Sequence, residues 1–181
     1  MPLAASNCQM TRKTEKEKNF LAITSQYKEM IAKVCYLYSG PEGTFDDLYQ
    51  EILINLWQGM DSFRGDAKVS TWIYRMAINT CISWHRRNSR HSSNYRLDDV
   101  IYDKADTSEN AAAFEEYREL YRLISLLGPI DKALITLWLD EKSYEEIGSI
   151  TGISTSNVAV RIHRIKEKLS KMAAQSGFTK G

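Results

Sequence analysis

The stretch STWIYRMAINTCISWHRR, residues 70–87, carries side chains suited to binding a nucleic acid. It combines Trp72 and Trp84 with three arginines and one asparagine. Arginine neutralises phosphate, an aromatic ring stacks on a base, and a side-chain amide bonds to a base edge. A plain amphipathic helix with a solvated arginine face remains an equally good interpretation of the composition.

Helical spacing divides this stretch into two sides. Apolar periodicity predicts a helix from about Val69 to about Arg87. Its predicted core side holds Ile73, Met76, Ala77, Thr80, Cys81 and Trp84, and its outer side holds Arg75, Asn79, Ile82, Ser83 and Arg86. Trp72 falls at the border, where its ring reaches the outer surface.

A second candidate site follows in KSYEEIGSITGISTSNVAVRIHRIKEKL, residues 142–169. Ser143 and Glu146 have capping-box spacing, Gly152 supplies a turn, and Ser154 caps the next helix. Ile153 and Val158 are spaced as a hydrophobic staple. A short helix, a glycine turn and a capped second helix predict a helix-turn-helix.

The second of these helices has an apolar stripe and a basic face. The stripe is Val158, Ile162, Ile165 and Leu169; the opposite face holds Ser156, Asn157, Val160, His163 and Arg164, with Arg161 and Lys168 beside it. Such a helix suits a major groove, because residues near its N-terminus reach base edges and basic flanks hold phosphates. The alternative is a surface helix with a solvated basic face.

The sequence offers little for catalysis, metal binding or membrane insertion. The histidines are His85, His91 and His163, all in basic surroundings, and the three cysteines are widely spaced. No nucleophile arrangement, phosphate loop or zinc spacing occurs, so we expect no catalytic residue, metal or cofactor. No apolar run reaches the roughly 20 residues of a membrane span, so we expect a cytoplasmic protein without membrane insertion.

Helical periodicity over most of the chain predicts an all-α protein of two small helical domains joined by a flexible linker. We expect a disordered tail over 1–16, a first domain over 17–88, a linker over 89–110, a second domain over 111–174 and a tail over 175–181. One amphipathic helix is expected from Phe20 to Cys35, a break at 39–43, and a new helix at Thr44.

Two segments resemble a known family. DDLYQEILINLWQGMDSFRGDAKVSTWIYRMAINTCISWHRR, residues 46–87, resembles region 2 of extracytoplasmic-function (ECF) sigma factors of the sigma-70 family. LGPIDKALITLWLDEKSYEEIGSITGISTSNVAVRIHRIKEKL, residues 127–169, resembles their region 4. The resemblance implies a transcription initiation factor that binds core RNA polymerase, reads the −35 and −10 promoter elements and helps open DNA. An anti-sigma factor is a further candidate partner.

The resemblance also implies site residues. It implies that one helix of this chain binds the clamp helices of the largest polymerase subunits. The residues expected to make these contacts are Asp47, Gln50, Glu51, Ile54, Asn55 and Trp57. Leu48, Ile52 and Leu56 form a core stripe on another face. Contacts to the opened −10 strand fall on Phe63, Arg64, Lys68, Ser70, Trp72, Arg75 and Asn79, with Arg86, Arg87 and Arg90 on upstream phosphates; Phe63 is equally well placed for the core.

The −35 contacts fall on Ser156, Asn157, Ala159, Val160, Arg161, His163, Arg164 and Lys168. Ala159 and Val160 depart from the family, which often has basic or polar residues there. Because of this departure, we expect Arg164 and His163 to make most of the base contacts, and Val160 to make an apolar contact with a thymine methyl. The alternative functions are an ordinary helix-turn-helix regulator, which leaves the first domain unexplained, and an enzyme, which no motif supports.

Overall fold

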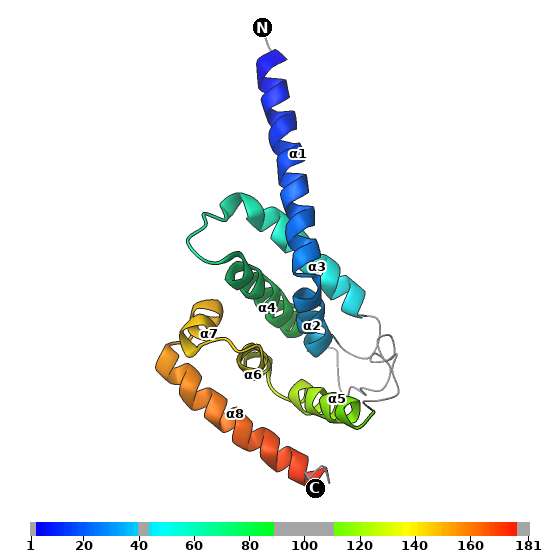
Figure 1. The fold of residues 1–181 in the computed structure, drawn as a ribbon, viewed down its shortest axis with the longest axis vertical. Helices are drawn as coiled ribbons and strands as arrows, with labels where there is room; N and C mark the ends of the chain where they lie inside the picture. Colours follow the sequence, from blue (N-terminus) through cyan, green and yellow to red (C-terminus); the bar gives the residue numbers. More distant parts are fainter. Residues whose placement is uncertain (1–2, 40–43, 89–110, 177–181) are drawn as a thin grey trace.

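The protein is described by a computed structural model that covers residues 3–39, 44–88 and 111–176. For residues 3–13 and 111–116 only the backbone is described. Within these ranges the chain forms helices and no strand, which confirms the all-α prediction (Figure 1). No helix in the described part of the chain is long and apolar enough to cross a membrane.

The first half of the chain holds four α-helices. They are α1 (Leu3–Gln26), α2 (Lys28–Tyr38), α3 (Thr44–Gly59) and α4 (Val69–Asn88), with a short 3-10 turn η1 (Met60–Ser62) after α3. α2, α3 and α4 pack on one another, and α1 projects away from them (Figure 1). Their shared core contains Leu48, Ile52 and Leu56, the stripe expected from the sequence.

Two expectations for the N-terminal part were wrong. Residues 3–16, expected to be a disordered tail, belong to helix α1. The segment TRKTEKEK consists mostly of good helix formers, so it extends the helix without an apolar stripe of its own. The expected single helix from Phe20 to Cys35 is interrupted at Tyr27, which leaves helical geometry (φ −108°, ψ 14°) and separates α1 from α2.

The second half holds α5 (Ala111–Ser125), α6 (Pro129–Leu139), α7 (Tyr144–Thr151) and α8 (Thr155–Gln175). Gly128 precedes Pro129 at the start of α6, where a proline costs no hydrogen bond. α6 ends at Leu139 with Asp140 as its C-cap, and Glu141 adopts a left-handed conformation (φ 57°) before the chain enters α7. The predicted linker, residues 89–110, lies outside the described residues.

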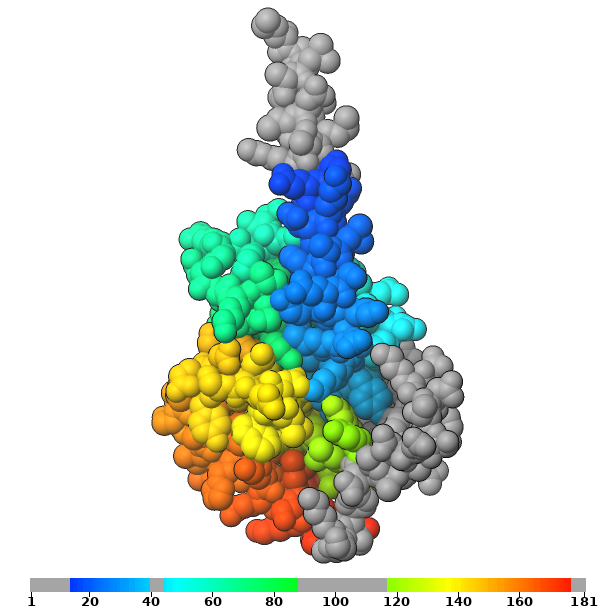
Figure 2. Space-filling model, in the orientation of Figure 1, coloured from blue at the N-terminus to red at the C-terminus, as the bar shows by residue number. Residues whose placement is uncertain are grey.

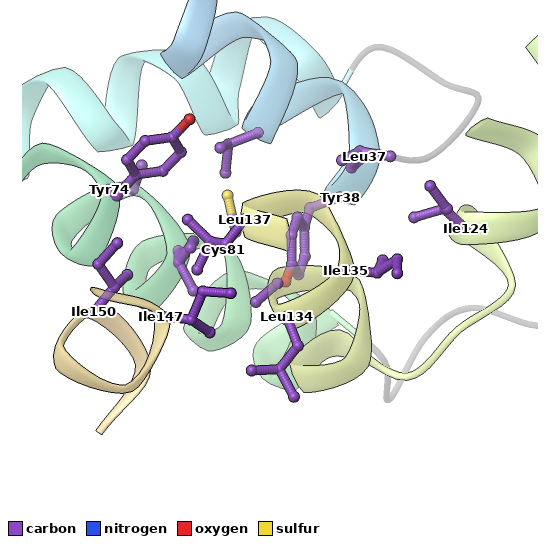
Figure 3. Packing of buried hydrophobic residues seen from close by; sticks show 14 of the residues in the cluster. Leu37, Tyr38, Tyr74, Cys81, Ile124, Leu134, Ile135, Leu137, Ile147 and Ile150 are labelled. Atoms are coloured by element: carbon purple, nitrogen blue, oxygen red, sulfur yellow. The ribbon is translucent and has the colours of Figure 1, made fainter. Parts of the chain in front are cut away.

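The two halves share one hydrophobic core. α4 packs against α2 and α3 on one side and against α6 and α7 on the other. Tyr74 and Ile78 on α4 are therefore buried, although the sequence placed neither on the core side. Trp84, expected at the centre of that side, is only half-buried. Figure 3 shows Tyr74 and Cys81 of α4 close to Ile147 and Ile150 of α7.

Candidate nucleic-acid interface

The helix-turn-helix predicted from the sequence is formed by α7 and α8. Ser143 Oγ accepts the backbone N–H of Glu146 at 3.2 Å, and the Glu146 carboxylate accepts the Ser143 N–H at 3.1 Å. The bond from the Ser143 backbone lowers the pKa of Glu146. These two bonds are the predicted capping box, and they fix where α7 begins.

Two glycines make the tight turn into α8. Gly152 has φ 76°, a left-handed conformation that glycine adopts without strain. A Cβ on Gly148 would lie 2.7 Å from the Ile153 carbonyl oxygen, so only glycine allows this close approach. Ser154 stands at the N-cap of α8, but its side chain makes no capping bond and lies 3.4 Å from Ser156 Oγ. The prediction of Ser154 as the N-cap is therefore correct in position, but the capping hydrogen bond of its side chain is not formed.

Burial of the predicted stripe aims the other face of α8 outward. Val158, Ile162, Ile165 and Leu169 are buried, as expected. The predicted contact residues on the opposite face are exposed, as is Lys168 beside it: Ser156, Asn157, Val160, His163 and Arg164. Ala159 is half-buried. An open concavity of about 590 Å³ lies at the start of α8, lined by residues 152–154 and by Asn157, Val160, Arg161 and Arg164.

The basic residues of this face differ in their partners. Arg161 is half-buried, and its guanidinium donates to Asp131 at the start of α6 at 2.7 Å. His163 Nε2 lies 3.8 Å from Glu167, with both side chains exposed. No ion pair within the described residues involves Arg164, which is exposed and lines the concavity. The structure therefore distinguishes Arg161, which has an ion-pair partner, from Arg164, which has none in the described residues.

The loop before α4 and the start of α4 form the second candidate surface. Phe63 and Trp72 pack with ring centroids 5.1 Å apart, and both side chains are half-buried. Arg64, Lys68, Arg75 and Asn79 are exposed around this pair, and Ser70 is half-buried. The two aromatic rings thus sit at the edge of a basic surface.

The basic end of α4 is linked to α3. Arg86 and Arg87 are exposed, and Arg90 lies outside the described residues. Arg87 forms an ion pair with Glu51 and places its guanidinium 5.7 Å from the centre of the Trp84 ring. A residue expected to bind polymerase and one expected to bind DNA are therefore paired with each other.

The predicted polymerase face on α3 is only partly open. Asp47, Gln50 and Ile54 are exposed side by side, whereas the core residues of α3 point elsewhere. Asn55 donates its amide to Thr80 Oγ1 at 2.9 Å, so it joins α3 to α4. Trp57 is half-buried: Phe20 packs edge-on at 5.2 Å between ring centroids, and Lys16 lies over its ring.

Tertiary packing adds residues that sequence reasoning missed. Asp131, the partner of Arg161, carries no local signal, because the two side chains meet only where α6 packs against α8. Lys166 lies 4.5 Å from the centre of the Trp138 ring for the same reason. No group of His, Cys, Asp or Glu side chains in the described ranges is arranged to hold a metal ion.

Two helical regions, one of them ending in a helix-turn-helix whose second helix exposes basic residues, are typical of helical DNA-binding proteins. The family model of sigma-70 region 2 matches residues 23–91, and that of sigma-70 region 4 matches residues 117–169.

Individual proteins show the same likeness over most of the chain. The ECF RNA polymerase sigma-E factor of Escherichia coli K12 is 30% identical, over 84% of this chain and 85% of that protein. The sigma factor YlaC of Bacillus subtilis is 31% identical, over 83% and 90%. These matches place the chain in the ECF sigma factors of the sigma-70 family. It is thus an RNA polymerase sigma factor, with a role in promoter recognition and transcription initiation.

Solved structures support the fold. Sigma factor RpoE of Bartonella quintana, bound to the anti-sigma factor NepR, matches with a TM-score of 0.69 and 16% identity, over 87% of this chain and 98% of that one. CnrH bound to the cytosolic domain of CnrY matches with a TM-score of 0.63 and 20% identity, over 88% and 90%.

Proposed function

We propose that this sigma factor reads the −35 element with the open face of α8, and that Arg164 and Asn157 make the base contacts. The availability of Arg164 carries this proposal: the residue is exposed near the middle of α8, lines the concavity and has no ion-pair partner in the described chain. A bidentate arginine recognises guanine O6 and N7, and an asparagine recognises adenine. Val160 supplies apolar contact to a thymine methyl.

In the same proposal, Arg161 and Lys168 bind phosphates of the DNA backbone. Arg161 is held by Asp131, so a phosphate must compete with that carboxylate before it binds the guanidinium. Lys168 is exposed two turns along the helix, where it reaches the backbone beside the groove. These residues add affinity and orientation, whereas Arg164 and Asn157 add sequence preference.

For the −10 element we propose capture of an unstacked base beside Phe63 and Trp72. Unstacking a base costs a few kcal/mol, which aromatic stacking and hydrogen bonds must offset. The half-buried ring pair supplies a stacking surface, Asn79 supplies an amide, and Arg64, Lys68 and Arg75 neutralise phosphates around it.

Docking on core polymerase is proposed for the exposed strip of α3 that holds Asp47, Gln50 and Ile54. Glu51 can join this strip only when its ion pair with Arg87 breaks. Asn55 is better explained by its hydrogen bond to Thr80, which connects α3 to α4. Because core polymerase and the chromosome occupy the cytoplasm, the proposed function also places the protein there. An anti-sigma factor is a proposed partner, by analogy with the two bound relatives.

One experiment tests these assignments together. Purified chain and core polymerase are supplied with a pool of randomised promoters, and the transcribed sequences are recovered. We expect two enriched elements and transcription only with polymerase present. Tight sequence-specific binding by the chain alone, without polymerase-dependent transcription, would support an ordinary helix-turn-helix regulator instead.

A further inference from the structure

Helix α1 touches the rest of the first half through side chains that face the end of α3. Between residues 14 and 19, every residue is exposed except Lys16, which is half-buried. Phe20, one turn further along, packs edge-on against Trp57 of α3, with 5.2 Å between the ring centroids. In Figure 2 the coloured part of α1 lies directly beside the blue-green surface of the turn after α3. The charged segment of α1 is therefore anchored on one side and solvated on the others.

Lys16 contacts the chain on both sides of this turn. Its ammonium lies 4.5 Å from the centre of the Trp57 ring, which precedes the turn. The same ammonium donates to the Asp61 carboxylate, in η1, at 2.5 Å. A cation beside a carboxylate and over an aromatic ring is attracted by both groups. Lys16 therefore fixes the end of α3 relative to η1.

The same turn carries the aromatic pair of the proposed −10 site. Phe63 follows η1 directly, and its backbone N–H donates to the Met60 carbonyl at 3.2 Å. Its ring packs against that of Trp72. A Cβ on Gly59 would lie 3.2 Å from the Trp72 ring, so the backbone of the turn also packs closely against this second ring. Both rings are therefore placed by the backbone that Lys16 holds.

We propose that α1 is a positioning element of the −10 site, in which Lys16 and Phe20 hold the turn over residues 57–63 in one conformation. In that conformation Phe63 and Trp72 form the surface that accepts an unstacked base. A stacking surface that is already ordered loses less conformational entropy when the base arrives, so capture is tighter. This inference rests on the proposed function, because it takes the base to be captured beside that ring pair.

The same contacts account for the partial burial of Trp57, a residue that the sequence predicted to bind polymerase. Lys16 lies over its ring and Phe20 packs edge-on against it. The ring is thus engaged within the chain, whereas the exposed strip of α3 stays available for docking. A change at Lys16 should therefore affect DNA opening without affecting the affinity for core polymerase.

The test compares variants of the full chain in complex with core polymerase. Lys16→Met keeps the aliphatic stem of the side chain and removes its charge, whereas Lys16→Arg keeps a cation that pairs with a carboxylate and stacks on a ring. Asp61→Asn removes the other half of the ion pair, at an exposed position that leaves the packing of α1 undisturbed. Lys18→Met is the matched control, because it removes the same charge from an exposed position of the same helix.

Promoter opening is measured by the permanganate reactivity of unpaired thymines, and affinity for core polymerase is measured separately. We expect Lys16→Met to lower opening about three- to tenfold, and Asp61→Asn to lower it less, because the asparagine variant keeps the contact with Trp57. The double variant should be no worse than Lys16→Met alone, because both changes break the same contact. Lys16→Arg should restore most of the opening, and Lys18→Met should leave it unchanged.

Direct binding of DNA by Lys16 gives a different pattern. Asp61→Asn would then free the ammonium and increase opening, and Lys16→Met would lower opening by a similar factor to Lys18→Met. Either result overturns the positioning role. Normal opening by Lys16→Met, or a loss of its affinity for core polymerase, overturns it as well.

Trp72→Ala distinguishes a failure of this inference from a failure of the proposed function. Normal opening by Trp72→Ala refutes base capture beside the ring pair, and the positioning role falls with it. Impaired opening by Trp72→Ala together with normal opening by Lys16→Met refutes the positioning role alone. Circular dichroism checks that each variant keeps its helices.

Discussion

Replacing Arg164 by alanine should remove base discrimination at the −35 element while leaving the rest of the protein intact. Arg164 is exposed, lines the concavity at the start of α8 and has no ion-pair partner in the described residues, so its loss leaves no buried group unsatisfied. A bidentate arginine–guanine contact contributes about 1–3 kcal/mol. The preference for the correct base should therefore fall roughly 5- to 150-fold at one position.

Arg161 provides the internal comparison, because the two arginines share a helix and differ in their partners. Its ion pair with Asp131, at 2.7 Å and half-exposed, contributes about 0–1 kcal/mol in the free protein. A phosphate contact formed by Arg161 must first replace this pair, so part of its gain is lost. Arg161→Ala should therefore lower transcription from all promoters slightly and by a similar factor.

The assay is run-off transcription with core polymerase on promoters that differ by single base pairs in the −35 element. Each variant's ratio between matched and mismatched promoters is compared with that of the unmutated chain at one salt concentration. The proposed role of Arg164 is refuted if Arg164→Ala lowers transcription from every promoter by the same factor. It is also refuted if Arg161→Ala changes the base preference more than Arg164→Ala does.

Three further variants test other parts of the structure. The double variant Trp72→Ala, Asn79→Ala should keep its affinity for core polymerase but open promoter DNA poorly, as measured by permanganate reactivity of unpaired thymines; lost polymerase binding would mean that α4 has another role. Gly148→Ala should destabilise the chain by about 1–3 kcal/mol in urea unfolding, because the new Cβ meets the Ile153 carbonyl; an unchanged midpoint would contradict this packing. Burial lowers the pKa of Lys132 to about 8, against about 10.4 unfolded, so the folded state binds fewer protons between these values and the lysine contributes more stability as pH rises. The unfolding free energy of wild type relative to Lys132→Met should therefore rise between about pH 8 and 10, by at most about 1.4 kcal/mol per pH unit; a constant difference would refute it.

The helix-turn-helix was predictable because its signals are local. The capping box needs only Ser143 and Glu146 at the right spacing, and the turn needs a glycine at 152. The stripe from Val158 to Leu169 follows from helical periodicity alone. For these features, neighbours in sequence are also neighbours in space, so the pattern and the structure agree.

The predicted sides of the helix over residues 70–87 agreed less well, because α4 is buried from two directions. A single helical wheel assumes one core, and it correctly placed Ile73, Ala77 and Cys81 inside. It could not anticipate that α6 and α7 cover Tyr74 and Ile78 from another side. Contacts between residues far apart in sequence decide this second burial.

The sequence by itself determined the all-α class, the helix-turn-helix and the exposed polar face of α8, since each depends on spacing within one helix or one turn. Tertiary structure alone decided which charged side chains remain available. Asp131 pairs with Arg161, Glu51 pairs with Arg87, and Asp140 binds Lys33 of α2 and Tyr74 of α4. Arg164 has no ion-pair partner in the described residues. Ion pairs form between side chains that packing brings within a few ångströms, and helical periodicity carries no information about which helices will meet.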